Sequence, residues 1–119
     1  MQPKSIKLLW DAKKAALRAQ DFLGSKTLDD YEQDALTVAA VERQFQIIGE
    51  ALYQLRNYDE ETAALVDDVN RIIAFRHMLV HAYDKVDDTI VWDAVTTKVP
   101  KLLIVIDNAL NGADDPSPS

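Results

Sequence analysis

Apolar residues recur every three or four positions over most of this 119-residue chain, which is the spacing of amphipathic helices. In residues 5–23 this pattern stops before Gly24, a residue type that commonly follows the end of a helix. The apolar stripe of this first segment consists of Leu9, Ala12, Ala16, Ala19 and Leu23. The sequence shows no convincing strand alternation and no hairpin dipeptide. The pattern therefore predicts an all-α fold.

The longest periodic segment, residues 34–56, carries two apolar stripes. The first contains Val38, Val41, Phe45, Ile48, Leu52 and Leu55. The second lies on nearly the opposite side and contains Leu36, Ala40, Ile47 and Ala51. Because a surface helix needs only one such stripe, two stripes predict a helix with neighbours on two sides. The second neighbour is either another helix of the same chain or a helix of another subunit.

Short helices are expected beside the long ones. Thr27 and Asp30 resemble a capping pair for a helical turn over residues 28–31. Asp59 is a good N-cap for a turn over residues 60–66. The chain should therefore alternate long helices with short helical connections.

The last helical region is predicted over residues 89–110, with Asp88 as its N-cap. Pro100 interrupts this region, although the apolar pattern stays in phase through it. Proline lacks the N–H donor and its ring clashes with the preceding turn. We therefore expect a kink or short break at Val99 and Pro100.

Residues 1–110 have the usual length of one domain, and we expect an antiparallel bundle of four to five main helices. Residues 111–119 are predicted to form a disordered tail. The N-terminal segment has no apolar core of a signal peptide, and no apolar run reaches the ~18 residues of a membrane span. The chain has no cysteine, which excludes disulfides and thiolate metal sites and is typical of the reducing cytosol. We therefore expect a cytoplasmic protein without a membrane segment.

The formal net charge is −7, which argues against broad nucleic-acid binding because such binding relies on a dense basic surface. It leaves room for a small basic pocket that holds one or two phosphates. An acidic surface also suits a basic partner.

One segment, residues 68–82, combines helical periodicity with candidate chemistry. Arg76 falls within its apolar stripe, which contains Val69, Ile72, Ile73, Leu79 and Val80. A guanidinium stays charged and is costly to bury without a partner. Arg76 is therefore expected either in an ion pair, with Glu50 or another carboxylate, or in a functional site.

Both histidines of the chain lie in the same segment. His77 and His81 are neighbours on the flank of the helix, where they could lack any joint role. Their spacing is also that of a zinc-binding helix face, but the glutamate of the H-E-x-x-H signature is absent and a third ligand is needed. Tyr83, taken alone, is typical of a rim residue with a buried ring and a wet hydroxyl.

Together, Arg76, His81 and Tyr83 suit phosphodiester cleavage without a metal. Arginine offers a planar fork of donors to phosphate oxygens, and histidine can move protons near neutral pH. RNA supplies its own nucleophile in the 2′-hydroxyl, so the expected product has a cyclic phosphate end. On an ideal helix Arg76 and His81 diverge by about 140°. Either the helix ends before His81, or two chains share the site.

Residues 76–83 resemble the motif of the HEPN ribonuclease superfamily, and more closely that of the HepT-type toxins. The motif is an arginine, four residues, a histidine, one residue and a tyrosine. His77 stands where members often have asparagine. The segment Val41–Ala51 is similar to the second long helix of the family, and Val91–Asp93 with the later Val99–Leu102 is similar to its last helical region, so the resemblance covers most of residues 5–110.

This resemblance implies a homodimer in which the motif helices of two chains form a composite ribonuclease cleft. It implies that Arg76 and His81 are catalytic and that His77 is an auxiliary residue of the site. It also implies a type VII toxin–antitoxin pair, in which an MNT-type nucleotidyltransferase antitoxin transfers AMP to Tyr83. No metal and no cofactor are expected. Two other hypotheses stay open at this point: a non-catalytic helical module that binds a nucleotide or a partner, and a metal hydrolase that uses His77 and His81.

Overall fold

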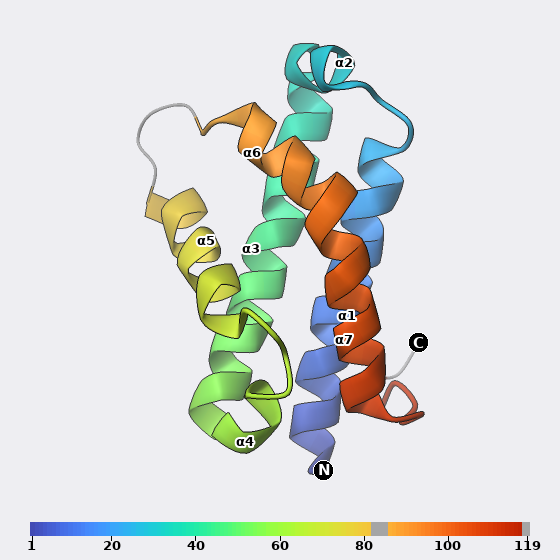
Figure 1. Cartoon of the computed structure of the whole chain (residues 1–119), viewed down its shortest axis with the longest axis vertical. Helices are drawn as coiled ribbons and strands as arrows, with labels where there is room; N and C mark the ends of the chain where they lie inside the picture. Colours follow the sequence, from blue (N-terminus) through green and yellow to red (C-terminus); the bar gives the residue numbers. More distant parts are fainter. Residues whose placement is uncertain (82–85, 118–119) are drawn as a thin grey trace.

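The computed structural model describes residues 1–81 and 86–117, and all regular structure in this part of the chain is helical (Figure 1). The predicted all-α class is therefore confirmed. The first helix, α1 (Pro3–Leu23), has a proline in its first turn, where no N–H donor is needed. It ends before Gly24, which has a φ of 57° and so adopts a backbone that other residues rarely do.

The helix with two apolar stripes is α3 (Ala35–Tyr58), and it lies in the middle of the bundle. Its N-cap is Asp34, whose side chain accepts a hydrogen bond from the Thr37 amide. Helix α1 packs along one side of α3, and α5 (Val69–His81) packs along another (Figure 1). Two sides of α3 are therefore covered by helices of the same chain, while Leu36 of the second stripe is 81% exposed.

The core lies between α1, α3 and the C-terminal helix α7 (Val99–Leu110). The predicted stripe of α1 is fully buried, and it is mostly alanine. Small side chains let two helices approach closely, because protein interiors pack without voids. From α7 the buried residues include Leu102, Ile106 and Ala109, which continue the apolar phase read from the sequence.

Both predicted short helices are present. Thr27 caps α2 (Leu28–Gln33) by accepting a hydrogen bond from the Asp30 amide. Asp59 caps α4 (Glu60–Ala63), and its carboxylate accepts hydrogen bonds from Thr62 and from the Ser5 hydroxyl at 2.7 Å. These bonds, chiefly those from Thr62, hold the pKa of Asp59 below its usual range. This one carboxylate thus joins the start of α1 to the end of α3.

The last helical region departs from the expectation in two details. Its first segment, α6 (Asp88–Asp93), is capped by Asp87 and not by Asp88, because Asp87 accepts the bond from the Thr89 amide. The irregularity lies one turn before the proline, as a π-helical turn η1 (Ala94–Lys98), and Pro100 sits in the first turn of α7. The wider turn removes the clash that proline would make with the preceding carbonyl.

Residues beyond α7 make two contacts with α1 where the sequence predicted a disordered tail. The indole Nε1 of Trp10 donates a hydrogen bond to the Ala113 carbonyl at 2.9 Å. Lys14 forms an ion pair with Asp115 at 2.7 Å. The chain is therefore held against α1 at least as far as Asp115. Within the described ranges, no helix has the length and apolar character needed to cross a bilayer.

Candidate functional site

Helix α5 carries the predicted site residues and packs mainly on α3. Ile73 and Leu79 are buried against the bundle, and the Phe75 ring meets Phe45 edge to face at 5.3 Å between centroids. Val80, which the periodicity placed in the apolar stripe, is 44% exposed. The helix therefore buries one narrow face and leaves much of its surface uncovered.

Gly49 is a point of very close approach between α3 and α5. A Cβ atom built at Gly49 would overlap the Cβ of Arg76 and would lie 2.5 Å from its Cγ. Carbon atoms in contact are normally 3.5–4.0 Å apart. The absence of a side chain at this position is thus what lets Arg76 lie directly on the surface of α3.

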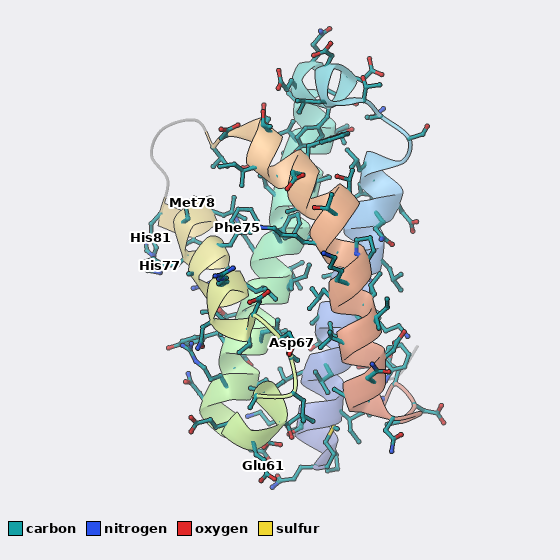
Figure 2. All side chains as sticks on the ribbon, in the orientation of Figure 1. Glu61, Asp67, Phe75, His77, Met78 and His81 are labelled. Atoms are coloured by element: carbon teal, nitrogen blue, oxygen red, sulfur yellow. The ribbon has the colours of Figure 1, made fainter. Side chains whose placement is uncertain are left out.

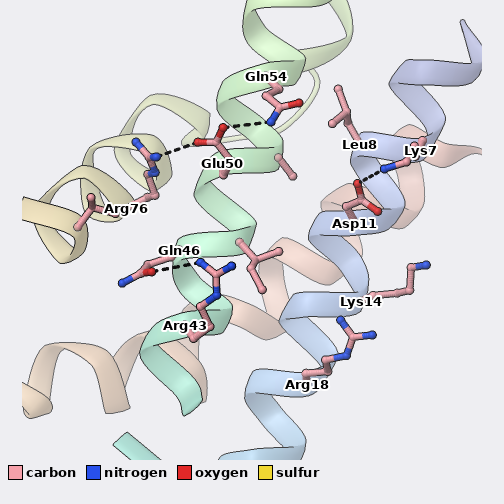
Figure 3. Close-up of a pocket in the computed structure, with 13 residues that line it drawn as sticks. Lys7, Leu8, Asp11, Lys14, Arg18, Arg43, Gln46, Glu50, Gln54 and Arg76 are labelled. Atoms are coloured by element: carbon pink, nitrogen blue, oxygen red, sulfur yellow. Dashed lines mark hydrogen bonds and ion pairs between the residues drawn. The ribbon is translucent and has the colours of Figure 1, made fainter. Parts of the chain in front are cut away.

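The Arg76 guanidinium forms an ion pair with Glu50, the residue after this glycine. Its Nη2 lies 2.9 Å from Glu50 Oε2, while Glu50 Oε1 accepts a hydrogen bond from Gln54 (Figure 3). Of the alternatives left open by the sequence, the structure shows the ion pair, with Glu50 as the carboxylate. The pair is only partly buried, because the two side chains are 27% and 42% exposed.

Not all N–H donors of Arg76 are used by its contacts within the described residues. Its Nε is buried and has no hydrogen-bond partner among the residues that the structure describes. A guanidinium has five N–H donors, and a buried donor without a partner is unusual in a native protein. Glu50 therefore occupies only part of the donor capacity of this partly exposed guanidinium.

His77 and His81 lie on the other side of α5 and are exposed. Figure 2 shows both at the outer edge of the molecule, with Met78 nearby. Their rings are 4.2 Å apart between centroids and tilted by 48°. Arg76 turns towards α3 while the two histidines face away from the bundle, so one chain does not bring the predicted catalytic pair together.

Two further expectations concern Tyr83 and a metal. Tyr83 and Ala82 lie outside the described residues. Within residues 1–81 and 86–117, no group of three His, Cys, Asp or Glu side chains is arranged to hold a metal ion. The third ligand that a zinc site on His77 and His81 would need is therefore not found in that part of the chain.

A cleft of about 500 Å³ opens between α1, α3 and α5, and Arg76 lies at its wall (Figure 3). We call it the basic cleft, because its charged lining consists of Lys7, Lys14, Arg18, Arg43 and Arg76 with only Asp11 and Glu50 of opposite sign. Among the described residues, five basic and two acidic side chains line it. A chain of net charge −7 therefore has an excess of basic residues around this cleft, as far as the described residues show.

Comparison with known proteins places this arrangement in a family. Residues 12–109 match the family model described as "Ribonuclease HepT-like". The chain belongs to the HepT-like ribonuclease family. It is also 33% identical over 82 residues to a protein of Methanocaldococcus jannaschii that is named as a candidate RNase. That match covers 67% of this chain and 65% of the relative, so it spans slightly less than two thirds of the relative. No solved structure matches the chain.

Sequence reasoning missed two features of this HepT-like chain that the structure supplies. One is Gly49, and an isolated glycine within a helical pattern is a signal of close packing. The other is the basic cleft. Lys7, Lys14 and Arg18 are spaced seven and four apart, which places them on one face of a helix. That Arg43 and Arg76 would meet this face could not be read from the pattern of either helix alone.

Proposed function

We propose that this protein is a metal-independent endoribonuclease and the toxin of a toxin–antitoxin pair, acting in the cytoplasm as a homodimer. Membership of the HepT-like ribonuclease family supports RNA cleavage at the level of the family. The observation that carries the proposal for this chain is Arg76, held at the wall of a basic cleft with unused donors, on the same helix as two exposed histidines.

The dimer is proposed because Arg76 and His81 face different sides of α5. A two-fold axis through the exposed face of α5 would bring the histidines of one chain towards the partner subunit. In a symmetric dimer, a contact between one residue of a chain and a different residue of its partner occurs twice, so two equivalent composite sites would form. Each site would combine an arginine from one chain with a histidine from the other.

The proposed reaction is an internal transesterification of RNA. His81 accepts the proton of the 2′-hydroxyl, the 2′-oxygen bonds to phosphorus, and the bond from phosphorus to the 5′-oxygen breaks. The leaving 5′-oxygen takes up a proton from water. Arg76 donates to the phosphate oxygens, on which charge develops in the transition state. His77 is an auxiliary polar group at the site.

RNA cleavage in excess EDTA tests this proposal. The purified protein should cut RNA at an unchanged rate when divalent metals are chelated, and the products should carry 2′,3′-cyclic phosphate and 5′-hydroxyl ends. Mass spectrometry of the fragments identifies those ends. A metal hydrolase would lose activity on chelation, and a non-catalytic binding module would leave the RNA intact.

We further propose that Tyr83 is the position at which an MNT-type nucleotidyltransferase antitoxin blocks the enzyme. Tyr83 is two residues beyond His81 in the sequence. An AMP group on its hydroxyl would place a phosphate where the phosphate of RNA must bind, and like charges repel.

Co-expression with a nucleotidyltransferase encoded next to this protein should raise the intact mass of this protein by one or more adenylyl groups. Peptide mapping should place them on Tyr83, and Tyr83→Phe should keep the unmodified mass and stay toxic in the presence of the antitoxin. The antitoxin would then have no hydroxyl to modify. Adenylylation that persists in Tyr83→Phe at the same level would contradict the proposal.

A further inference from the structure

The charges of the basic cleft are not equally neutralised. Lys7 pairs with Asp11 at 2.8 Å, and Arg76 pairs with Glu50 at 2.9 Å. Arg18 and Arg43, by contrast, form no ion pair with any residue that the structure describes. Both are exposed. The positive charge that is free to meet a ligand is therefore concentrated at these two arginines.

Arg18 and Arg43 come from two different helices, α1 and α3, that run side by side. Figure 3 shows them at the same end of the cleft, opposite the end marked by Gln54. Among the described residues, Arg43 has only a long hydrogen bond to Gln46, at 3.4 Å, which leaves most of its donors available. Two guanidinium groups on adjacent helices can donate hydrogen bonds from both sides to a strand that carries a row of acceptor oxygens.

The lining of the cleft indicates which part of RNA it would hold. Among the described residues that line it there is no aromatic side chain, so this part of the lining offers no stacking platform of the kind on which unpaired bases usually rest. Arginine forks match the geometry of phosphate oxygens. The chemistry of the cleft thus suits the sugar–phosphate backbone and not the bases, and phosphate contacts position a nucleic acid without reading its sequence.

We propose that Arg18 and Arg43 form a docking subsite for RNA backbone phosphates, continuous with the phosphate position at Arg76. This inference rests on the proposed ribonuclease function. The subsite aligns the strand along the α1–α3 face, so that the scissile phosphate reaches Arg76. It also explains how a strongly acidic chain binds an acidic substrate: the attraction is local and confined to one cleft.

The test measures binding of fluorescein-labelled single-stranded RNA by anisotropy, in a His81→Ala background that prevents cleavage. Arg18→Gln/Arg43→Gln is compared with Lys98→Gln/Lys101→Gln, which removes the same charge from exposed positions that line a different cleft. Replacing both arginines by glutamine should weaken RNA binding on the order of tenfold, equally for two unrelated RNA sequences. The slope of log K against log salt should then be shallower by about 1.4, the value for two lost contacts to a single strand.

Arg18→Lys/Arg43→Lys keeps the charge but loses the fork, and its affinity should lie between the parent and the glutamine variant. The inference would be overturned if Arg18→Gln/Arg43→Gln and Lys98→Gln/Lys101→Gln bound RNA with equal affinity. It would also be overturned if the parent protein bound no RNA at any salt concentration.

Cleavage is measured in parallel with His81 intact, which separates the two proposals. A protein that cleaves RNA but ignores the arginine substitutions refutes the subsite and keeps the function. A protein that binds RNA through these arginines but never cleaves it refutes the function and keeps the subsite.

Discussion

Replacing His81 by alanine is expected to lower the rate of RNA cleavage by about 10²–10⁴-fold, the usual contribution of a general base. The fold should be unaffected, because the imidazole is exposed and its one described contact is with the ring of His77. The rate is measured under single-turnover conditions, and circular dichroism and melting temperature verify the fold. His77→Ala is the matched control, since it removes the same ring from the same exposed face. Because His77 is proposed as an auxiliary residue, His77→Ala should lower the cleavage rate much less than His81→Ala.

The same variants test whether the site is shared between chains. Co-expressed Arg76→Ala and His81→Ala chains would form mixed dimers in which one composite site keeps both groups. With random pairing, half of the dimers are mixed and each has one intact site of two, so about a quarter of the wild-type activity should return. No recovery in purified mixed dimers would show that each chain uses its own Arg76 and His81. A His81→Ala variant that cleaves at the wild-type rate would remove the histidine from the mechanism.

Gly49→Ala is expected to destabilise the fold and to reduce activity more than the loss of folded protein explains. The added Cβ would overlap Arg76 at atoms anchored to the backbone, so α3 and α5 must move apart. Overpacking of this kind typically costs about 1–3 kcal/mol of the free energy of unfolding. The displacement would also move Arg76 away from Glu50 and the basic cleft. Chemical denaturation gives the stability, and cleavage per folded molecule gives the second effect.

The double variant Gly49→Ala/Arg76→Gly tests whether the destabilisation by Gly49→Ala comes from the close packing against Arg76 or from another cause. It removes the Cβ that the new methyl group meets, so its stability should exceed the value obtained by adding the two single effects. Whether Gly49→Ala alone raises or lowers the free energy of unfolding is also informative. Alanine is favoured over glycine in a helix by about 1 kcal/mol when nothing opposes it. A Gly49→Ala protein that is more stable than the wild type would therefore contradict the close approach of the two helices.

Much of the fold was predictable because the helices of this chain obey local rules. The stripes of α1 and α3 follow the helical period, and Thr27 and Asp59 cap the short helices as their side chains allow. The errors fall where two local signals compete. Asp87 and Asp88 are both good caps, and only the backbone geometry chose the first. The strain of Pro100 was relieved one turn earlier than expected, because a π-helical turn absorbs it without ending the helical region.

The candidate site divides differently between sequence and structure. The sequence by itself determined that Arg76 lies on an apolar face, that His77 and His81 are neighbours, and that Arg76 and His81 diverge, because these relations depend only on positions along one helix. Tertiary structure alone decided what each face meets. It brought Gly49 and Glu50 to Arg76, left the histidines exposed, and gathered basic residues from three helices into one cleft. Helical periodicity states which side chains share a face, but the partner of that face is chosen by packing between segments far apart in the chain.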